Sequence, residues 1–275
     1  MDYSDVVYKG KDTVLLGVKH FELDHTLECG QCFRWQGEEG AYSGIAHGRR
    51  LEILLEGGAL ILKDVSLDEF ESVWKNYFDL GRDYSEIHRR FSKDKTLCEA
   101  LAFAPGIRVM RQAPWETLIT YILSQNSNIP RIKGMVARLC ECYGEPLPCG
   151  GFTFPEPERL AALTIDDLAP LKCGYRAAYI LDAAWLVSEG ELELNALYAL
   201  PVEEARRELM CIRGVGPKVA ECVLLYGFGK VECYPLDVWM KRVMAAFYPS
   251  GFSEDLSDTA GIAQQFLFHY ARIKQ

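Results

Sequence analysis

The chain has 275 residues, 49% of them hydrophobic and 25% charged, with a formal net charge of −9 at pH 7. This composition is that of a folded globular protein and excludes fibrous and wholly disordered classes. Charged residues interrupt every apolar run and the acidic N-terminus carries no signal-peptide pattern, so we expect a cytoplasmic protein without a membrane segment.

The first 65 residues are predicted to form antiparallel strands. Two apolar runs within residues 51–65 are joined by Gly57-Gly58, which is a good hairpin signal. A second candidate hairpin spans residues 32–46, with its turn between residues 37 and 40. Cys29 and Cys32 have the spacing of half a zinc or redox site, but no second such pair exists. We therefore predict no metal or redox centre at this pair.

Helical patterns replace the strands from Leu67 onward. Apolar residues of 67–80 recur on one helical face, and Ser66 is a suitable N-cap. A central apolar helix is predicted within 115–128, and the next helix should end at Gly144, before a loop over 145–156 that is rich in Pro and Gly. Further helices are predicted within 175–190, 201–212, 217–229, 237–248 and 259–273. The fold class is therefore α+β, with an antiparallel sheet domain over residues 1–100 and a helical domain over 101–275.

Cationic residues gather between positions 106 and 140, where Glu116 is the single acidic residue. They are Arg108, Arg111, Arg131, Lys133 and Arg138. A basic face for a polyanionic partner is therefore compatible with the negative net charge, because local fields matter more than totals.

Residues 203–229 have the pattern of a helix–hairpin–helix motif. Gly214 and Gly216 allow backbone conformations that a side chain would forbid, and Pro217 suits the first position of a helix. Such a turn presents backbone N–H groups and a positive helix end to a phosphate. We therefore predict that Gly214, Val215 and Gly216 contact DNA, although a joint that serves only packing is the alternative.

Two further residues point to catalysis. Lys218 lies on the first turn of an apolar helix, where partial desolvation, in part by Cys222, can make an amine nucleophilic. Asp237 follows in Pro-Leu-Asp-Val, at the expected start of the next helix, where an ordinary N-cap is the simpler interpretation. Together, the amine and the carboxylate are interpreted as a catalytic pair.

These motifs resemble those of a known family. The hairpin GVGPKVAEC and YPLDV are accompanied, in order, by GQCFRW (30–35), RQAPWETLITYILSQNSNIPRI (111–132), CGYRAAYI (173–180) and AGIAQQFLF (260–268). The whole set resembles the 8-oxoguanine DNA glycosylases of the helix–hairpin–helix (endonuclease III) superfamily, in its lysine-bearing, bifunctional branch. The resemblance covers nearly the whole chain, including the N-terminal sheet domain, and implies an all-α glycosylase core of two helical subdomains.

The resemblance also implies an activity. It is that of a DNA glycosylase and AP lyase of base excision repair that removes 8-oxoguanine from duplex DNA, preferably opposite cytosine. The partner is then double-stranded DNA that contains 8-oxoguanine, and we expect a monomer without cofactor, associated with the nucleoid if the protein is bacterial. Lys218 matches the nucleophile that attacks C1′ of the deoxyribose and forms a Schiff base. Asp237 matches the carboxylate that assists departure of the base.

Four residues match the family's contacts to the damaged base. Gly30 matches the glycine whose carbonyl accepts the N7–H group that only the oxidised purine carries. Gln264 resembles the residue that reads the Watson–Crick edge. Phe268 and Cys222 match the two residues that sandwich the base, although Phe268 at helical spacing is also compatible with a core position and Gln264 with a surface position.

Four more residues match contacts to the opened duplex. A base must leave the stack before chemistry reaches its glycosidic bond, and the gap needs a filler. Asn126 matches that filler and Tyr175 the wedge beside it, while Arg131 and Arg176 match the pair that contacts the orphaned cytosine.

The sequence departs from the family pattern at two positions. Trp239 stands two residues after Asp237, where the familiar animal and fungal enzymes have histidine, and Ser127 interrupts an asparagine run. Two alternatives remain open at this point. An alkylated-base glycosylase would lack the hairpin lysine, and a DNA-binding module without catalysis would need only the hairpin.

Overall fold

The computed structural model describes residues 2–274, which divide into two compact units. Unit 1 comprises residues 2–44, 51–111 and 231–274, and unit 2 comprises residues 45–50 and 112–230. Each unit is described by itself below. The sequence-based division at residue 100 stays a prediction.

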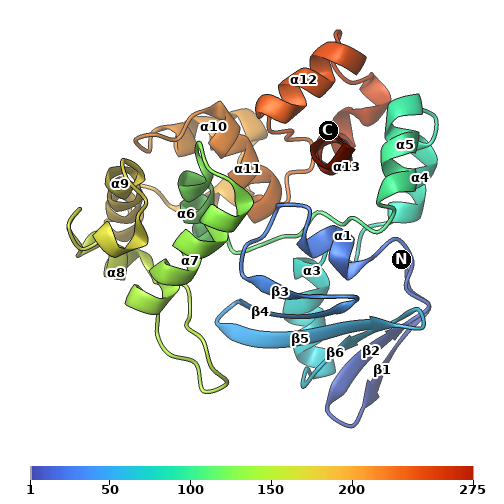
Figure 1. The fold of residues 1–275 in the computed structure, drawn as a ribbon, viewed down its shortest axis with the longest axis horizontal. Coiled ribbons are helices and arrows are strands. Elements are labelled where there is room, and N and C mark those ends of the chain that lie inside the picture. The colour runs from blue at the N-terminus through green and yellow to red at the C-terminus, as the bar shows by residue number, and fades with distance from the viewer. Residues whose placement is uncertain (1, 275) are drawn as a thin grey trace. The chain divides into compact units, whose positions relative to one another are not determined.

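A six-stranded sheet forms the N-terminal part of the chain, in the strand order β1-β2-β6-β5-β4-β3 (Figure 1). The hairpin at Gly57-Gly58 is confirmed, since both glycines have positive φ, 57° and 76°, as a two-residue turn between β5 and β6 requires. The hairpin around residues 37–40 is also confirmed, between β3 and β4. The strands are β1 (Asp5–Lys9), β2 (Asp12–Leu16), β3 (Trp35–Glu38), β4 (Ala41–Ala46), β5 (Arg49–Glu56) and β6 (Ala59–Leu62).

The predicted helix after Leu67 packs against this sheet. It consists of α2 (Leu67–Glu69), a π-helical segment (Phe70–Trp74) and α3 (Lys75–Tyr77). Ser66 caps it as predicted, because its Oγ accepts a hydrogen bond of 3.2 Å from the backbone N–H of Glu69. Trp35 of β3 donates through Nε1 to the hydroxyl of Tyr77 over 2.8 Å, and its ring lies 5.7 Å from that of Phe78.

The C-terminal helix of unit 1 lies against two earlier helices. Phe266 of α13 contacts Phe91 of α4 with ring centroids 6.1 Å apart, and Tyr270 of α13 donates to Glu99 of α5 over 2.9 Å. Residues far apart in sequence therefore share one core. The remaining elements of unit 1 are α1 (Leu23–Leu27), α4 (Tyr84–Phe91), α5 (Lys95–Phe103), α12 (Val238–Phe247), the 3-10 segment Glu254–Thr259 and α13 (Ala260–Lys274).

Unit 2 is helical. Its helices are α6 (Pro114–Ser124), α7 (Ile129–Tyr143), α8 (Pro157–Ala161), α9 (Arg176–Ser188), α10 (Val202–Met210) and α11 (Pro217–Phe228), with 3-10 segments at Ala169–Leu171 and Leu194–Tyr198. Gly144 ends α7 as predicted, but in an extended conformation rather than a left-handed one. A side chain there would lie 2.1 Å from the carbonyl oxygen of Thr153, so the close approach of the 145–156 loop requires glycine.

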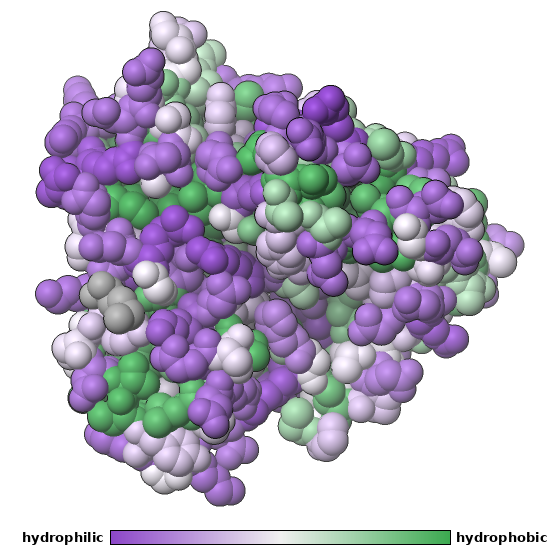
Figure 2. Space-filling model, turned by 180° about the vertical axis from the view of Figure 1, so that it is seen from behind, coloured by the Kyte–Doolittle hydropathy of each residue, from purple (hydrophilic) through white to green (hydrophobic). Residues whose placement is uncertain are grey.

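The face of the molecule that Figure 2 shows is largely hydrophilic. Figure 2 shows hydrophobic side chains in separate patches among polar ones. Among the described residues, no helix is both long and apolar enough to cross a bilayer. These fold features agree with the α+β class predicted from the sequence.

Candidate active site

The hairpin of unit 2 is built as the sequence predicts. Gly214 has φ of 80°, and a Cβ atom there would lie 2.2 Å from the ring of Tyr179 on α9. The backbone N–H of Arg213 donates to Asp182 of the same helix over 2.7 Å, which fixes the turn against α9. The N–H of Val215 donates inside the turn to Ile212. Among the described residues, the N–H groups of Gly214 and Gly216 have no such partner and remain open to an external anion.

Lys218 is half-buried on the first turn of α11. Its Nζ lies over the ring of Tyr121 at 5.3 Å from the centroid, a cation–π contact. Tyr121 in turn stacks on Tyr226 with centroids 5.4 Å apart and an interplanar angle of 8°. Cys222, one turn beyond the lysine, is 3% exposed. The amine is thus flanked by aromatic and apolar groups on its own helix and on α6.

The residues predicted to open the duplex lie together in unit 2. Arg176 is 3% exposed and donates to three backbone carbonyls, those of Gln125, Asn126 and Cys173. Asn126 is exposed and held at φ of 46°, a left-handed conformation that asparagine tolerates better than most residues. The ring of Tyr175, 53% exposed, lies 4.7 Å from the guanidinium carbon of Arg176. One buried arginine therefore connects the predicted filler to the predicted wedge.

Arg131 and the hairpin are linked to the group formed by Asn126, Tyr175 and Arg176. Arg131 is exposed near the start of α7 and its Nη2 lies 3.5 Å from the carbonyl of Lys172, in the segment that carries Tyr175. The rings of Tyr175 and Tyr179 contact at 5.6 Å, and Tyr179 supports Gly214. Filler, wedge, Arg131 and hairpin thus form one connected surface of unit 2.

In unit 1 the loop around Gly30 is held by buried glutamines. Gly30 has φ of 89°. Gln31, fully buried, donates to the carbonyls of Thr26 and Arg108, and its Oε1 accepts from the N–H of Met110. Cys29 and Cys32, which have the spacing of half a zinc or redox site, are both buried, and burial raises the pKa of the Cys29 thiol to about 12.

The C-terminal helix α13 is tied to this loop. Gln265 donates to the carbonyl of Cys29 over 3.1 Å, and Arg272 donates to that of Glu28 over 2.9 Å. The structure therefore brings Gly30 and the helix that carries Gln264 and Phe268 together, although they are more than 230 positions apart.

Gln264 and Phe268 occupy different environments on α13. Gln264 is 3% exposed, so the surface alternative is wrong. Its buried Oε1 has no hydrogen-bond partner among the described residues, as expected for a polar atom reserved for a ligand. Phe268 is half-buried, with the guanidinium of Arg272 5.7 Å from its ring.

Asp237 is the N-cap of α12. Its Oδ1 accepts from the N–H of Met240 over 2.7 Å, which is the capping role that the sequence left open. No hydrogen bond joins its Oδ2 to any described residue. The cap fixes the carboxylate and leaves one oxygen for a substrate, so capping and catalysis are compatible.

The prediction of a basic face between residues 106 and 140 is wrong for Arg108. Arg108 is fully buried in unit 1, where it pairs with Asp2 at 2.5 Å and donates to the carbonyls of Asp79 and His20. Its neighbours Ile107, Val109 and Met110 are all buried, so the segment that contains Arg108 lies in the core and not on the surface. Within the described chain, no group of three or more His, Cys, Asp or Glu side chains is arranged to hold a metal ion.

Comparison with known proteins identifies the family. Residues 13–118 match the N-terminal domain of 8-oxoguanine DNA glycosylase, and residues 119–261 match the HhH-GPD superfamily of base excision DNA repair proteins. The chain belongs to the 8-oxoguanine DNA glycosylase family. This is a family of DNA N-glycosylases with DNA lyase activity, so the fold and the enzyme class expected from the sequence are both confirmed.

Individual relatives extend over most of this glycosylase. The N-glycosylase/DNA lyase of Saccharomyces cerevisiae is 36% identical over 255 residues, which cover 82% of this chain and 68% of the yeast protein. The 8-oxoguanine glycosylase/lyase of Clostridium acetobutylicum, solved with double-stranded DNA containing cytosine opposite 8-oxoG, superposes with a TM-score of 0.94 at 35% identity, over 100% of this chain and 99% of that one. A structure described as MBOgg1 in complex with low affinity DNA ligand gives 0.93 at 42% identity, over 99% of both chains.

The sequence reasoning missed one part of this glycosylase site. Tyr121 and Tyr226 were not singled out, yet their stacked rings support Lys218. The available signal was an aromatic residue in each of the two central apolar helices, which on sequence alone is indistinguishable from core packing.

Proposed function

We propose that this protein excises 8-oxoguanine opposite cytosine from duplex DNA and then cleaves the strand through a Schiff base on Lys218. The observation that carries the proposal is the connected surface of unit 2, on which Asn126, Tyr175, Arg131 and the hairpin are linked through Arg176, Lys172 and Tyr179. The partner is double-stranded DNA, as in the related complexes.

The hairpin holds one strand through the free N–H groups of Gly214 and Gly216, which needs no basic side chain. Val215, with its N–H used internally and its side chain buried, keeps the turn rigid. This grip explains how a chain with net charge −9 can bind a polyanion.

Asn126 then fills the gap left by the flipped base and Tyr175 separates the neighbouring pair. Arg131 is exposed and reads the orphaned cytosine directly. Arg176 donates four of its five N–H groups to backbone carbonyls, so the second N–H of Nη1 is the one left for the cytosine.

The flipped base is read by the four residues that match the base contacts of the family, Gly30, Gln264, Phe268 and Cys222. The carbonyl of Gly30 accepts the N7–H group, which guanine lacks, and the unpaired Oε1 of Gln264 accepts from the Watson–Crick edge. Phe268 stacks on one face of the base and Cys222 contacts the other. Specificity for the oxidised base therefore depends on the carbonyl of Gly30, in a loop that the hydrogen bonds of Gln31 hold in place.

For the chemistry, the neutral amine of Lys218 attacks C1′ and the bond from C1′ to the base nitrogen breaks, so that the base leaves with the electron pair. The free Oδ2 of Asp237 stabilises the positive charge that develops on the sugar. Loss of a proton from Lys218 and opening of the sugar ring give the Schiff base. Elimination of the 3′ phosphate then nicks the strand.

The test uses labelled duplexes with 8-oxoguanine opposite each of the four bases, with borohydride added to trap the Schiff base. We expect excision and trapping to be greatest opposite cytosine and trapping to be absent in Lys218→Gln. Equal activity opposite all four bases would remove the cytosine-reading roles of Arg131 and Arg176. Base release without any trapped adduct would contradict the lyase chemistry.

A further inference from the structure

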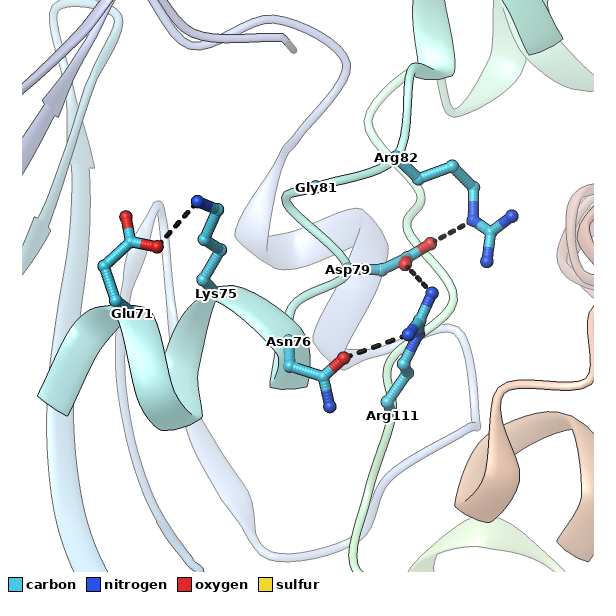
Figure 3. A pocket seen from close by; sticks show the side chains of 7 residues that line it. All are labelled: Glu71, Lys75, Asn76, Asp79, Gly81, Arg82 and Arg111. Atoms are coloured by element: carbon cyan, nitrogen blue, oxygen red, sulfur yellow. Dashed lines mark hydrogen bonds and ion pairs between the residues drawn. The ribbon is translucent and has the colours of Figure 1, made fainter. Parts of the chain in front are cut away.

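A cavity of about 500 Å³ lies within unit 1, and none of the residues that line it has a role in the proposed function (Figure 3). The residues that line it come from the helical stretch 71–76, from the turn over 79–82 that follows it, and from position 111. They are Glu71, Lys75, Asn76, Asp79, Gly81, Arg82 and Arg111.

One buried carboxylate organises this cavity. Asp79 is 2% exposed and held at φ of 51°. Its Oδ2 accepts from Nε of Arg82 at 2.7 Å and from the hydroxyl of Tyr84 at 3.2 Å, while its Oδ1 pairs with Nη2 of Arg111 at 2.9 Å. Three of the roughly four acceptor sites of the carboxylate are thereby used, and a single negative charge faces two guanidinium groups.

Several N–H donors of these arginines are left over. Arg111 uses Nη1 on the amide oxygen of Asn76 at 3.0 Å, but its Nε is buried without a partner. The terminal nitrogens of Arg82 make no hydrogen bond to any described residue, and Figure 3 shows them turned away from Asp79. A buried donor without an acceptor carries a desolvation penalty that an acceptor would relieve.

The other charges around the cavity do not neutralise this excess. Lys75 pairs with Glu71 at 2.7 Å and is balanced. Glu232 acts on Arg82 electrostatically, but it makes no ion pair with it in the described chain. A Cβ atom at Gly81 would meet nothing within 4 Å, so there is free space beside this residue of the lining.

We propose that this cavity binds a phosphate group through the free guanidinium edges of Arg82 and Arg111. Phosphate offers several acceptor oxygens for the N–H groups that lack a partner, and its negative charge balances the excess positive charge. The planar guanidinium group of arginine suits the recognition of phosphate. The phosphate belongs either to the DNA backbone or to a free phosphate-bearing molecule. Only the DNA source rests on the proposed function, since binding of free phosphate is independent of glycosylase activity.

The first arm measures inorganic phosphate binding to the full chain by ³¹P NMR line broadening at constant ionic strength. We expect saturable binding by the wild type and at least 10-fold weaker binding by Arg82→Gln. Arg89→Gln is the matched control, because it removes the same charge from an exposed arginine paired with Glu86 on α4. Wild-type protein gives a second readout that needs no variant, since phosphate should raise its Tm above that in chloride.

The second arm measures affinity for an undamaged duplex as a function of salt, so that failure of excision does not affect it. A backbone phosphate bound in the cavity predicts that Arg82→Gln lowers the slope of log K against log salt by about 0.9, while Arg89→Gln leaves it unchanged. Phosphate binding with an unchanged slope assigns the cavity to a free phosphate-bearing molecule. No phosphate binding, no Tm change and no slope change would overturn the proposal, as would equal effects in both variants.

Discussion

The two units hold their predicted site residues by different means. In unit 2, Asn126, Tyr175 and Arg131 are exposed, and their positions are set by backbone carbonyls gathered around Arg176 and by the left-handed turns at Asn126 and Gly214. In unit 1, Gly30 and Gln264 are set by buried side chains, above all Gln31 and Gln265. A surface that must accept any DNA sequence depends on backbone shape. A pocket that must distinguish one base depends on buried polar atoms.

The largest expected effect lies in the buried network of unit 1. Arg108→Met leaves the carboxylate of Asp2 buried without its cation, so the free energy of unfolding should fall by about 3–5 kcal/mol. Urea denaturation measures this loss. The double variant with Asp2→Asn should recover part of it, and a single variant as stable as the wild type would show that the network does not brace this unit.

Asp237→Asn tests whether capping and catalysis separate at one residue. Asparagine is as good an N-cap as aspartate, so the stability and the duplex affinity should stay unchanged. Base excision should fall by about 10²–10³-fold, because the amide cannot stabilise the charge on the sugar. Single-turnover kinetics measure the loss, and Asp237→Ala should lose stability as well. Wild-type excision by the asparagine variant would leave Asp237 as a cap only.

Gly214→Ala and Gly216→Ala test the backbone grip of unit 2. Alanine at 214 must adopt φ of 80° and place its methyl against Tyr179, so the unfolding free energy should fall by about 1–3 kcal/mol. At 216 a Cβ meets nothing within 4 Å, and the stability should hold. Binding assays on an undamaged duplex should show weaker binding by both. Unchanged binding by Gly216→Ala would mean that DNA does not approach this turn closely.

The smallest expected effect is a gain in stability, from the substitution Gln264→Leu. Gln264→Leu removes a buried acceptor without a partner, so thermal unfolding should show a gain of about 1 kcal/mol. Excision of 8-oxoguanine should nevertheless fall. Gln265→Leu is the control, because it breaks the bond to Cys29 and should destabilise the protein. A loss of stability in Gln264→Leu would show that its amide serves the fold.

Local elements could be predicted from the sequence because each carries its own signal. The Gly57-Gly58 hairpin, the Ser66 cap and the helix–hairpin–helix turn depend on neighbours within a few residues. Contacts between distant segments carry no such signal. The bond between Gln265 and Cys29 and the burial of Arg108 depend on tertiary packing. The conformation of Gly144 depends on the 145–156 loop that packs against it. The sequence therefore predicted that α7 ends at Gly144 but did not predict the backbone angles of this residue.

The loop at Gly30 has a chemical consequence for the protein's own durability. Burial raises the pKa of the Cys29 thiol to about 12, so the thiol stays protonated at neutral pH, whereas the thiolate is the form that peroxides attack. The exposed thiols, Cys98, Cys142, Cys149 and Cys211, react first. Peroxides, which attack thiolates, therefore react slowly with the loop that is proposed to recognise 8-oxoguanine.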